Sequence, residues 1–288
     1  MSRADREYDK THLSIDTAEE RILVHRDYIA HCLRWSHVIK HLYKSGRYHN
    51  ARILDVGCGR EAPLAKLLYS NRMTGARYTG IDMNKLEMPE MLAKAVLNGK
   101  LSVQLLGETD ASKVRVDDLA VGYPNIITCF EVFEHVHPRI ARDMLLNLRM
   151  LVKEDAFMFF STPCWNGSAA ANHVNETTYD AMAAVLHECG WEVRAVYGTF
   201  ASQTDYKDKL NVCEAHVFAR LQEYYDSNLL AVMLAPLFPH LSRNALWVCA
   251  PGEALRGLLD KAQKPWSQHA DWEQLAQEGE DEHLPRSH

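Results

Sequence analysis

A glycine-rich turn follows a short apolar run at residues 53–62 (ILDVGCGREA). Gly57 and Gly59 leave the backbone free to turn sharply and to approach a ligand closely. The residues beyond the turn predict a helix, whose first N–H groups and positive dipole end favour an anionic or nucleotide-like group. The spacing Gly57-x-Gly59-x-x-Ala62 also satisfies the dinucleotide fingerprint, so a nicotinamide-dependent or flavin-dependent enzyme is one open alternative.

Two carboxylates near this turn bear on the choice of ligand. Asp55 stands two positions before Gly57, where its negative charge would repel a pyrophosphate and attract an ammonium group. Asp82 ends the next predicted strand, where a carboxylate can accept hydrogen bonds from both ribose hydroxyls of a nucleoside. Asp55 therefore favours S-adenosylmethionine (SAM) over a dinucleotide, whereas Asp82 is compatible with both.

A second group of polar residues follows the fourth predicted strand, in the segment EVFEHVHP. If this segment is helical, Glu131, Glu134 and His135 share one face, because they are spaced i, i+3, i+4. Two carboxylates and one imidazole would form half of a divalent-metal site, and His173, after the fifth predicted strand, is the candidate for a fourth ligand. The alternative is a metal-free pocket in which His135 acts alone as a general base.

The elements that must position these residues alternate between strands and helices, which predicts an α/β fold with a parallel sheet. The predicted strands are residues 52–56, 78–82, 101–106, 125–130, 157–161, 191–200 and 245–250. The predicted helices are residues 19–44, 63–69, 88–97, 138–151 and 177–189, with helical segments also at 213–225 and 229–235. Because ligands bind beyond the carboxyl ends of such strands, we expect both groups of polar residues at one edge of the sheet.

The glycine turn and its acidic neighbours resemble the class I SAM-dependent methyltransferases. Their first motif, [DE]-x-G-x-G, matches Asp55-Val56-Gly57-Cys58-Gly59, and their second strand ends in an acidic residue, as Asp82 does here. The resemblance covers residues 51–163 and implies a Rossmann-like sheet, mostly parallel with an antiparallel last strand. It also implies that SAM is the cofactor and that Asp110, or alternatively Asp117, holds the adenine amino group. The implied cofactor-binding residues are Asp55, Gly57, Gly59, Asp82, Met83 and Asp110.

The ExxEH segment followed by a histidine resembles two groups of metal-assisted O-methyltransferases, which act on the 3′ ends of small RNAs and in the ubiquinone pathway. This resemblance implies that Glu131, Glu134, His135 and His173 bind Mg²⁺ or Mn²⁺, with His135 also the catalytic candidate. A bound cation would stabilise the alkoxide of a hydroxyl group. We therefore expect methylation of an oxygen on a small molecule, a nucleotide or RNA.

Three alternatives to this function stay open. One is a metal-independent methyltransferase acting on a nitrogen or a nucleobase. The others are an NAD-dependent oxidoreductase and a SAM-binding subunit without catalytic activity.

Composition sets wider limits. The 288 residues are 47% hydrophobic and 24% charged, which is typical of globular proteins, and the net charge of −6 argues against a wholly basic protein that coats nucleic acid. We expect an N-terminal helical cap (residues 1–50), a SAM-binding domain (51–252) and a polar, acidic tail (253–288). An insertion before the last strand (201–242) would be a lid or an oligomerisation surface, so a homo-oligomer is also open.

The sequence further predicts a cytoplasmic protein with no membrane partner. Its seven cysteines are scattered without a CxxC pair, so a disulfide framework is not expected. The first residues are polar rather than apolar as in a signal peptide, and no segment approaches the length of apolar sequence that spans a bilayer.

Overall fold

A computed structural model describes residues 26–165, 169, 172–200, 210–225, 227–239 and 242–252. The α-helices are α3 (Arg26–Lys44), α4 (Pro63–Ser70), α5 (Glu90–Leu97), α6 (Pro138–Met150), α7 (Tyr179–Glu188), α9 (Val212–Gln222) and α10 (Ser227–Leu234). The strands are β1 (Arg52–Val56), β2 (Arg77–Ile81), β3 (Ser102–Leu106), β4 (Ile126–Phe130), β5 (Phe157–Pro163), β6 (Trp191–Phe200) and β7 (Asn244–Pro251). Short 3₁₀ helices occupy η1 (Arg47–His49), η2 (Val116–Asp118), η3 (Phe133–His135) and η4 (Ala235–Leu237).

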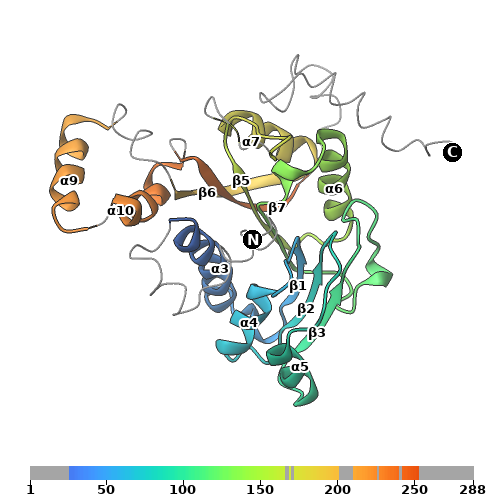
Figure 1. The fold of residues 1–288 in the computed structure, drawn as a ribbon. Helices are drawn as coiled ribbons and strands as arrows, with labels where there is room; N and C mark the ends of the chain where they lie inside the picture. The colour runs from blue at the N-terminus through green and yellow to red at the C-terminus, as the bar shows by residue number, and fades with distance from the viewer. Residues whose placement is uncertain are drawn as a thin grey trace. The chain divides into compact units, whose positions relative to one another are not determined.

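The strands form one sheet in the order β3-β2-β1-β4-β5-β7-β6 (Figure 1). Strands β1 to β5 pair in parallel, and antiparallel strands complete the sheet at its β6 end. The chain order reverses between β1 and β4, which is the topological switch point where ligands bind in open α/β sheets. The expected Rossmann-like fold class is confirmed.

The chain divides into two compact units. One comprises Gly46–Ala195 and Trp247–His288 and contains β1 to β5 with α4 to α7. The other comprises Met1–Ser45 and Val196–Leu246 and contains α3, α9 and α10. The boundary between the units passes through β6 and β7, and the expected domain limits at residues 50 and 252 remain predictions. The expected acidic tail and the first residues of the predicted N-terminal helix lie outside the described residues.

Strands β1, β4 and β5 are mostly buried, as is usual when helices cover a parallel sheet, whereas β3 at the edge of the sheet is only partly buried. Ile53, Leu54, Ile126 and Ile127 are fully buried. The crossovers of a parallel sheet are right-handed, so the reversal of strand order places α4 and α5 on one face and α6 on the other (Figure 1). No helix among the described residues combines the length and the apolar character needed to cross a membrane.

A buried carboxylate joins the three central strands. Asp55 on β1 is 5% exposed, and its two oxygens accept hydrogen bonds of 2.6 Å from Tyr78 Oη on β2 and from Thr128 Oγ1 on β4. Burial raises the pKa of Asp55 to about 6, because desolvation outweighs the two hydrogen bonds and the charge of Asp82 acts in the same direction as burial.

This raised pKa predicts a pH-dependent stability. Between its ordinary value near 4 and about 6, the folded state holds the Asp55 proton more tightly than the unfolded state does. The contribution of Asp55 to the free energy of unfolding is therefore greatest below pH 4 and falls by about 3 kcal/mol as the pH rises through 6. Urea unfolding of the SAM-free protein from pH 4 to pH 8 should show that Asp55→Asn removes this fall.

Asp117→Asn is the matched control, since it removes a carboxylate that is exposed on η2. If Asp55→Asn and Asp117→Asn have the same pH dependence as the wild type, the buried carboxylate does not titrate in this range.

Candidate functional site

The glycine turn joins β1 to α4 at the carboxyl edge of the sheet. Gly57 and Gly59 both have left-handed backbone conformations, with φ of +67° and +69°. A Cβ atom on Gly57 would lie 2.2 Å from Val132 Cγ2, whereas a Cβ on Gly59 would meet nothing within 4 Å. Gly57 therefore allows the segment after β4 to pack against the turn, and Gly59 keeps an open space beside the backbone.

Asp82 lies next to this open turn. Its Oδ2 accepts a hydrogen bond of 3.0 Å from the Gly59 N–H, and its Oδ1 accepts two of 2.8 Å from the backbone N–H and the side-chain amide of Asn84. Met83 follows with a side chain that is 69% exposed. A charged acceptor, an open backbone and an apolar surface thus occur together, and they fit the ribose and base of an adenosyl group.

The other two predicted carboxylates are already engaged. Asp55 lies beneath the turn with both oxygens hydrogen-bonded to Tyr78 and Thr128. Asp110 lies in the loop after β3, where its Oδ1 accepts hydrogen bonds from the N–H and the hydroxyl of Ser112 at 2.9 and 2.7 Å. Burial acts to raise the pKa of Asp110. The hydrogen bonds from Ser112 and the Lys113 ammonium at 3.1 Å outweigh this effect, so the pKa is lowered. Contact of either residue with a cofactor remains a prediction.

The condition under which Glu131, Glu134 and His135 would share one helical face is not met. Only Phe133–His135 forms a helix, a single 3₁₀ turn, and Glu131 precedes it with a φ of +55°. The Glu131 N–H donates to the Ser161 carbonyl at 3.0 Å, and its Oε1 accepts from the Ser161 hydroxyl at 2.8 Å. His137, which precedes Pro138 at the start of α6, is extended with a ψ of 136°, so the 3₁₀ turn does not continue into α6.

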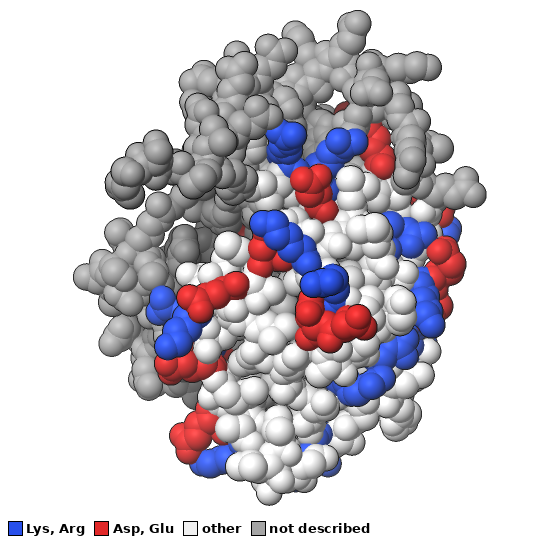
Figure 2. Space-filling model, turned by 90° about the vertical axis from the view of Figure 1, so that its right-hand side faces the viewer, with Lys and Arg blue, Asp and Glu red and all other residues white. Residues whose placement is uncertain are grey.

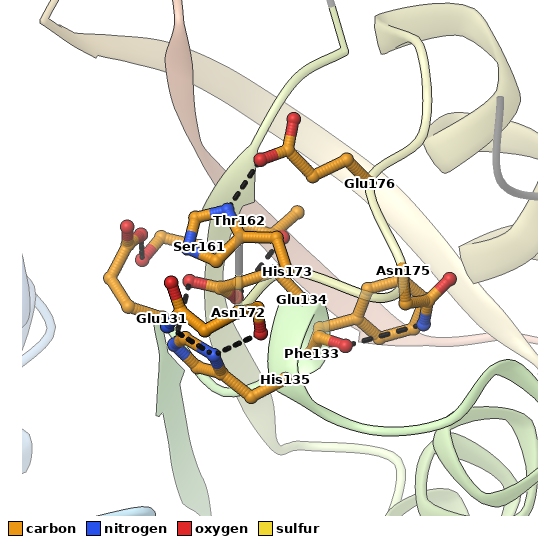
Figure 3. A network of polar contacts seen from close by, with 10 residues as sticks. All are labelled: Glu131, Phe133, Glu134, His135, Ser161, Thr162, Asn172, His173, Asn175 and Glu176. Atoms are coloured by element: carbon orange, nitrogen blue, oxygen red, sulfur yellow. Dashed lines mark hydrogen bonds and ion pairs between the residues drawn. The ribbon is translucent and has the colours of Figure 1, made fainter. Parts of the chain in front are cut away.

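Three of the four predicted metal ligands nevertheless lie together. The potential ligand atoms of Glu134, His135 and His173 are all within 4.8 Å of one another (Figure 3). Glu134 is 1% exposed and accepts a hydrogen bond of 3.3 Å from the Thr162 hydroxyl, while its other oxygen is 3.8 Å from His135 Nε2. Glu131 is not part of this group, and its predicted role as a ligand would require it to leave Ser161.

The loop that carries His173 is fixed at both of its ends. The N–H groups of Val174 and Asn175 donate to the Glu134 carbonyl at 2.8 and 3.2 Å. The Thr177 carbonyl accepts from the Trp165 N–H at 2.7 Å, directly after β5. His173 Nδ1 contacts the buried carboxylate of Glu176, so Nε2 is its remaining ring nitrogen (Figure 3).

Glu176 is not among the site residues predicted from the sequence, although its spacing of three residues from His173 is a signal that could have pointed to it.

The donor set fits a divalent cation. One carboxylate and two imidazoles suit Mn²⁺, Fe²⁺ or Zn²⁺ better than Mg²⁺, which prefers oxygen ligands. Ligand bonds of about 2.1 Å place the donor atoms around one ion roughly 3 to 4 Å apart. The three side chains would therefore move together slightly to bind an ion.

Comparison with known proteins shows the family of the chain. A family model described as a methyltransferase domain matches residues 33–196, which is more than half of the chain. The ubiquinone biosynthesis O-methyltransferase of Yersinia enterocolitica is 33% identical over 123 residues, which cover 42% of this chain and 46% of that protein. The match thus spans less than half of that curated relative.

Solved structures share the fold. The magnesium protoporphyrin IX methyltransferase of Synechocystis PCC 6803 with bound S-adenosylhomocysteine (SAH) aligns with a TM-score of 0.53 at 13% identity, over 86% of this chain and 94% of that one. The same enzyme with bound SAM aligns with a TM-score of 0.51 at 14% identity, over 87% and 92%. With the family model covering most of the first unit, the chain belongs to the methyltransferase-domain family.

Proposed function

We propose that this enzyme transfers the methyl group of SAM to a hydroxyl oxygen of a small molecule, with a divalent cation held by Glu134, His135 and His173. The observation that carries this proposal is the convergence of these three side chains beyond β4 and β5, next to the glycine turn. The partial similarity to an enzyme named as an O-methyltransferase supports oxygen as the acceptor.

Binding of SAM is assigned to the turn and its neighbours. Gly59 offers an approachable backbone, Asp82 would accept the ribose hydroxyls, and Met83 would pack against the adenosine. Asp110 is the proposed acceptor for the adenine amino group. Asp55 would position the glycine turn without contacting SAM, because its hydrogen bonds to Tyr78 and Thr128 fix the strand that leads into Gly57.

A bound divalent cation would lower the pKa of a coordinated hydroxyl and so supply the nucleophile. The protein residues would contribute position and charge. Glu134 brings a buried negative charge, which favours a cation at this place. Val132 packs against Gly57 in the proposed cofactor turn. Glu134 and His135 follow Val132 closely in the sequence, so the acceptor hydroxyl would lie near the methyl group of SAM, as methyl transfer requires.

A metal-free transfer is the second candidate, and one observation favours it. The side chain of His135 is 39% exposed, and its Nδ1 lies 3.2 Å from both the carbonyl oxygen and the side-chain amide nitrogen of Asn172. With the proton on Nδ1 and the carbonyl as its acceptor, Nε2 would be the nitrogen that accepts the hydroxyl proton.

We propose a small molecule as the first acceptor class to test, with RNA or nucleotide substrates second. On the face shown in Figure 2, lysine and arginine residues are interspersed with aspartate and glutamate. A nucleic-acid-binding face usually presents a continuous basic field, so the visible part of this face does not have that character.

Removing the Asp82 carboxylate should weaken SAM binding strongly. Each hydrogen bond to a charged group contributes about 1.5–3 kcal/mol, so Asp82→Ala should raise the dissociation constant for SAM by about 100-fold or more. Isothermal titration calorimetry with SAM measures this change. Asn84→Ala is the control, because it keeps Asp82 and removes a competing donor, so it should bind SAM at least as tightly as the wild type.

The metal site is tested by Mn²⁺ binding and by methyl transfer from tritiated SAM to a panel of hydroxylated small molecules. His173→Ala should abolish Mn²⁺ binding and methyl transfer while leaving the affinity for SAM unchanged. His187→Ala, at an exposed histidine of α7, should behave as the wild type in all three measurements. Methyl transfer that survives EDTA treatment would contradict the metal and support His135 as the base.

A further inference from the structure

Glu176 is a buried carboxylate in direct contact with one of the proposed metal ligands. It is 0% exposed, and its Oε1 contacts His173 Nδ1. In Figure 3 this contact reaches the His173 ring from the side opposite to His135. The Glu176 carboxylate therefore binds Nδ1 of His173. Nε2 remains for a cation on the side of Glu134 and His135.

The backbone on both sides of Glu176 is held in place. Asn175, its predecessor, donates its side-chain amide to the Phe133 carbonyl at 3.2 Å and its N–H to the Glu134 carbonyl at 3.2 Å. Thr177, its successor, pairs with Cys164 in a parallel bridge at the end of β5. The Glu176 carboxylate is thus positioned by two elements, η3 and β5, that also carry or adjoin the proposed ligands.

The charge of Glu176 also needs an explanation. Burying a carboxylate costs several kcal/mol, whereas an amide side chain of the same shape could accept the same Nδ1–H at a lower desolvation cost. A full negative charge on Glu176 would be stabilised if a cation were bound on the other side of the His173 ring. Carboxylate–histidine–metal arrangements have this form, and in them the carboxylate fixes the ring tautomer and raises the basicity of the ligating nitrogen.

We propose that Glu176 is a positioning residue that holds His173 with its proton on Nδ1 and its Nε2 lone pair directed at the cation site. This inference rests on the proposed function for its purpose, but the state of the His173 ring can be measured without any metal.

The first measurement is ¹⁵N NMR of histidine side chains in the full-length, metal-free protein, at a pH where the rings are neutral. The His173 signals are assigned by their loss in His173→Ala. In the wild type, Nδ1 should carry the proton. In Glu176→Ala, the proton should move to Nε2 in a substantial fraction of molecules, whereas Glu176→Gln should retain it on Nδ1 because the amide oxygen still accepts.

The second measurement is Co²⁺ binding followed by its absorption spectrum, with the folded state checked by circular dichroism. Glu176→Gln should weaken Co²⁺ binding by about 10-fold through loss of charge, and Glu176→Ala by about 100-fold through loss of charge and orientation. Glu188→Gln and Glu188→Ala are the matched controls, because Glu188 is also a buried carboxylate of the same unit, at 7% exposure on α7. These controls should bind Co²⁺ as the wild type does.

The outcomes separate the two proposals. An unchanged His173 tautomer in Glu176→Ala, or equal losses of Co²⁺ affinity in the Glu176 and Glu188 variants, would overturn the role of Glu176. A wild type that holds Nδ1 protonated through Glu176 but binds neither Co²⁺ nor Mn²⁺ would support the positioning contact and overturn the proposed metal function.

Discussion

The site depends on a close contact between the turn after β1 and the segment after β4. Val132 occupies the space that a side chain at position 57 would need, since a Cβ there would lie 2.2 Å from its Cγ2. A glycine in a left-handed conformation is therefore required twice over, for the path of the turn and for this packing. The contact makes the cofactor turn and the segment bearing Glu134 and His135 direct neighbours, although more than seventy residues separate them in the sequence.

The hydrogen bonds of the buried Asp55 carboxylate connect three adjacent strands of the sheet next to this contact. Asp55 accepts hydrogen bonds from β2 and β4, so the strand that feeds the turn is tied to both of its neighbours. The link costs desolvation, which the raised pKa of Asp55 records. A purely apolar position would avoid this cost, but it would not fix the lateral position of β1 against β4 through side-chain hydrogen bonds. The arrangement gives up some stability at neutral pH for a defined geometry at the switch point.

Sequence patterns were sufficient for the sheet and insufficient for the details of the site. β1 and β6 have the bounds predicted from apolar runs, and the other strands differ by a few residues, because strands and helices follow local periodicity. The spacing of Glu131, Glu134 and His135 would put them on one face only of an α-helix, and no such helix forms, because Glu131 is left-handed and His137, before Pro138, is extended. Glu176 lies only three residues from His173, but its burial depends on the contacts of this loop with η3 and with the end of β5, which join segments that are distant in sequence.

Asn84 donates to Asp82 twice. An ionised carboxylate has about four acceptor positions, and Gly59 together with Asn84 fills three of them. In the proposed binding mode, a ribose that engages Asp82 through both hydroxyls would have to displace the Asn84 side chain. SAM and its demethylated product carry the same ribose, so this exchange would weaken the binding of both to the same degree. Discrimination between the two would then depend on the groups around the sulfur.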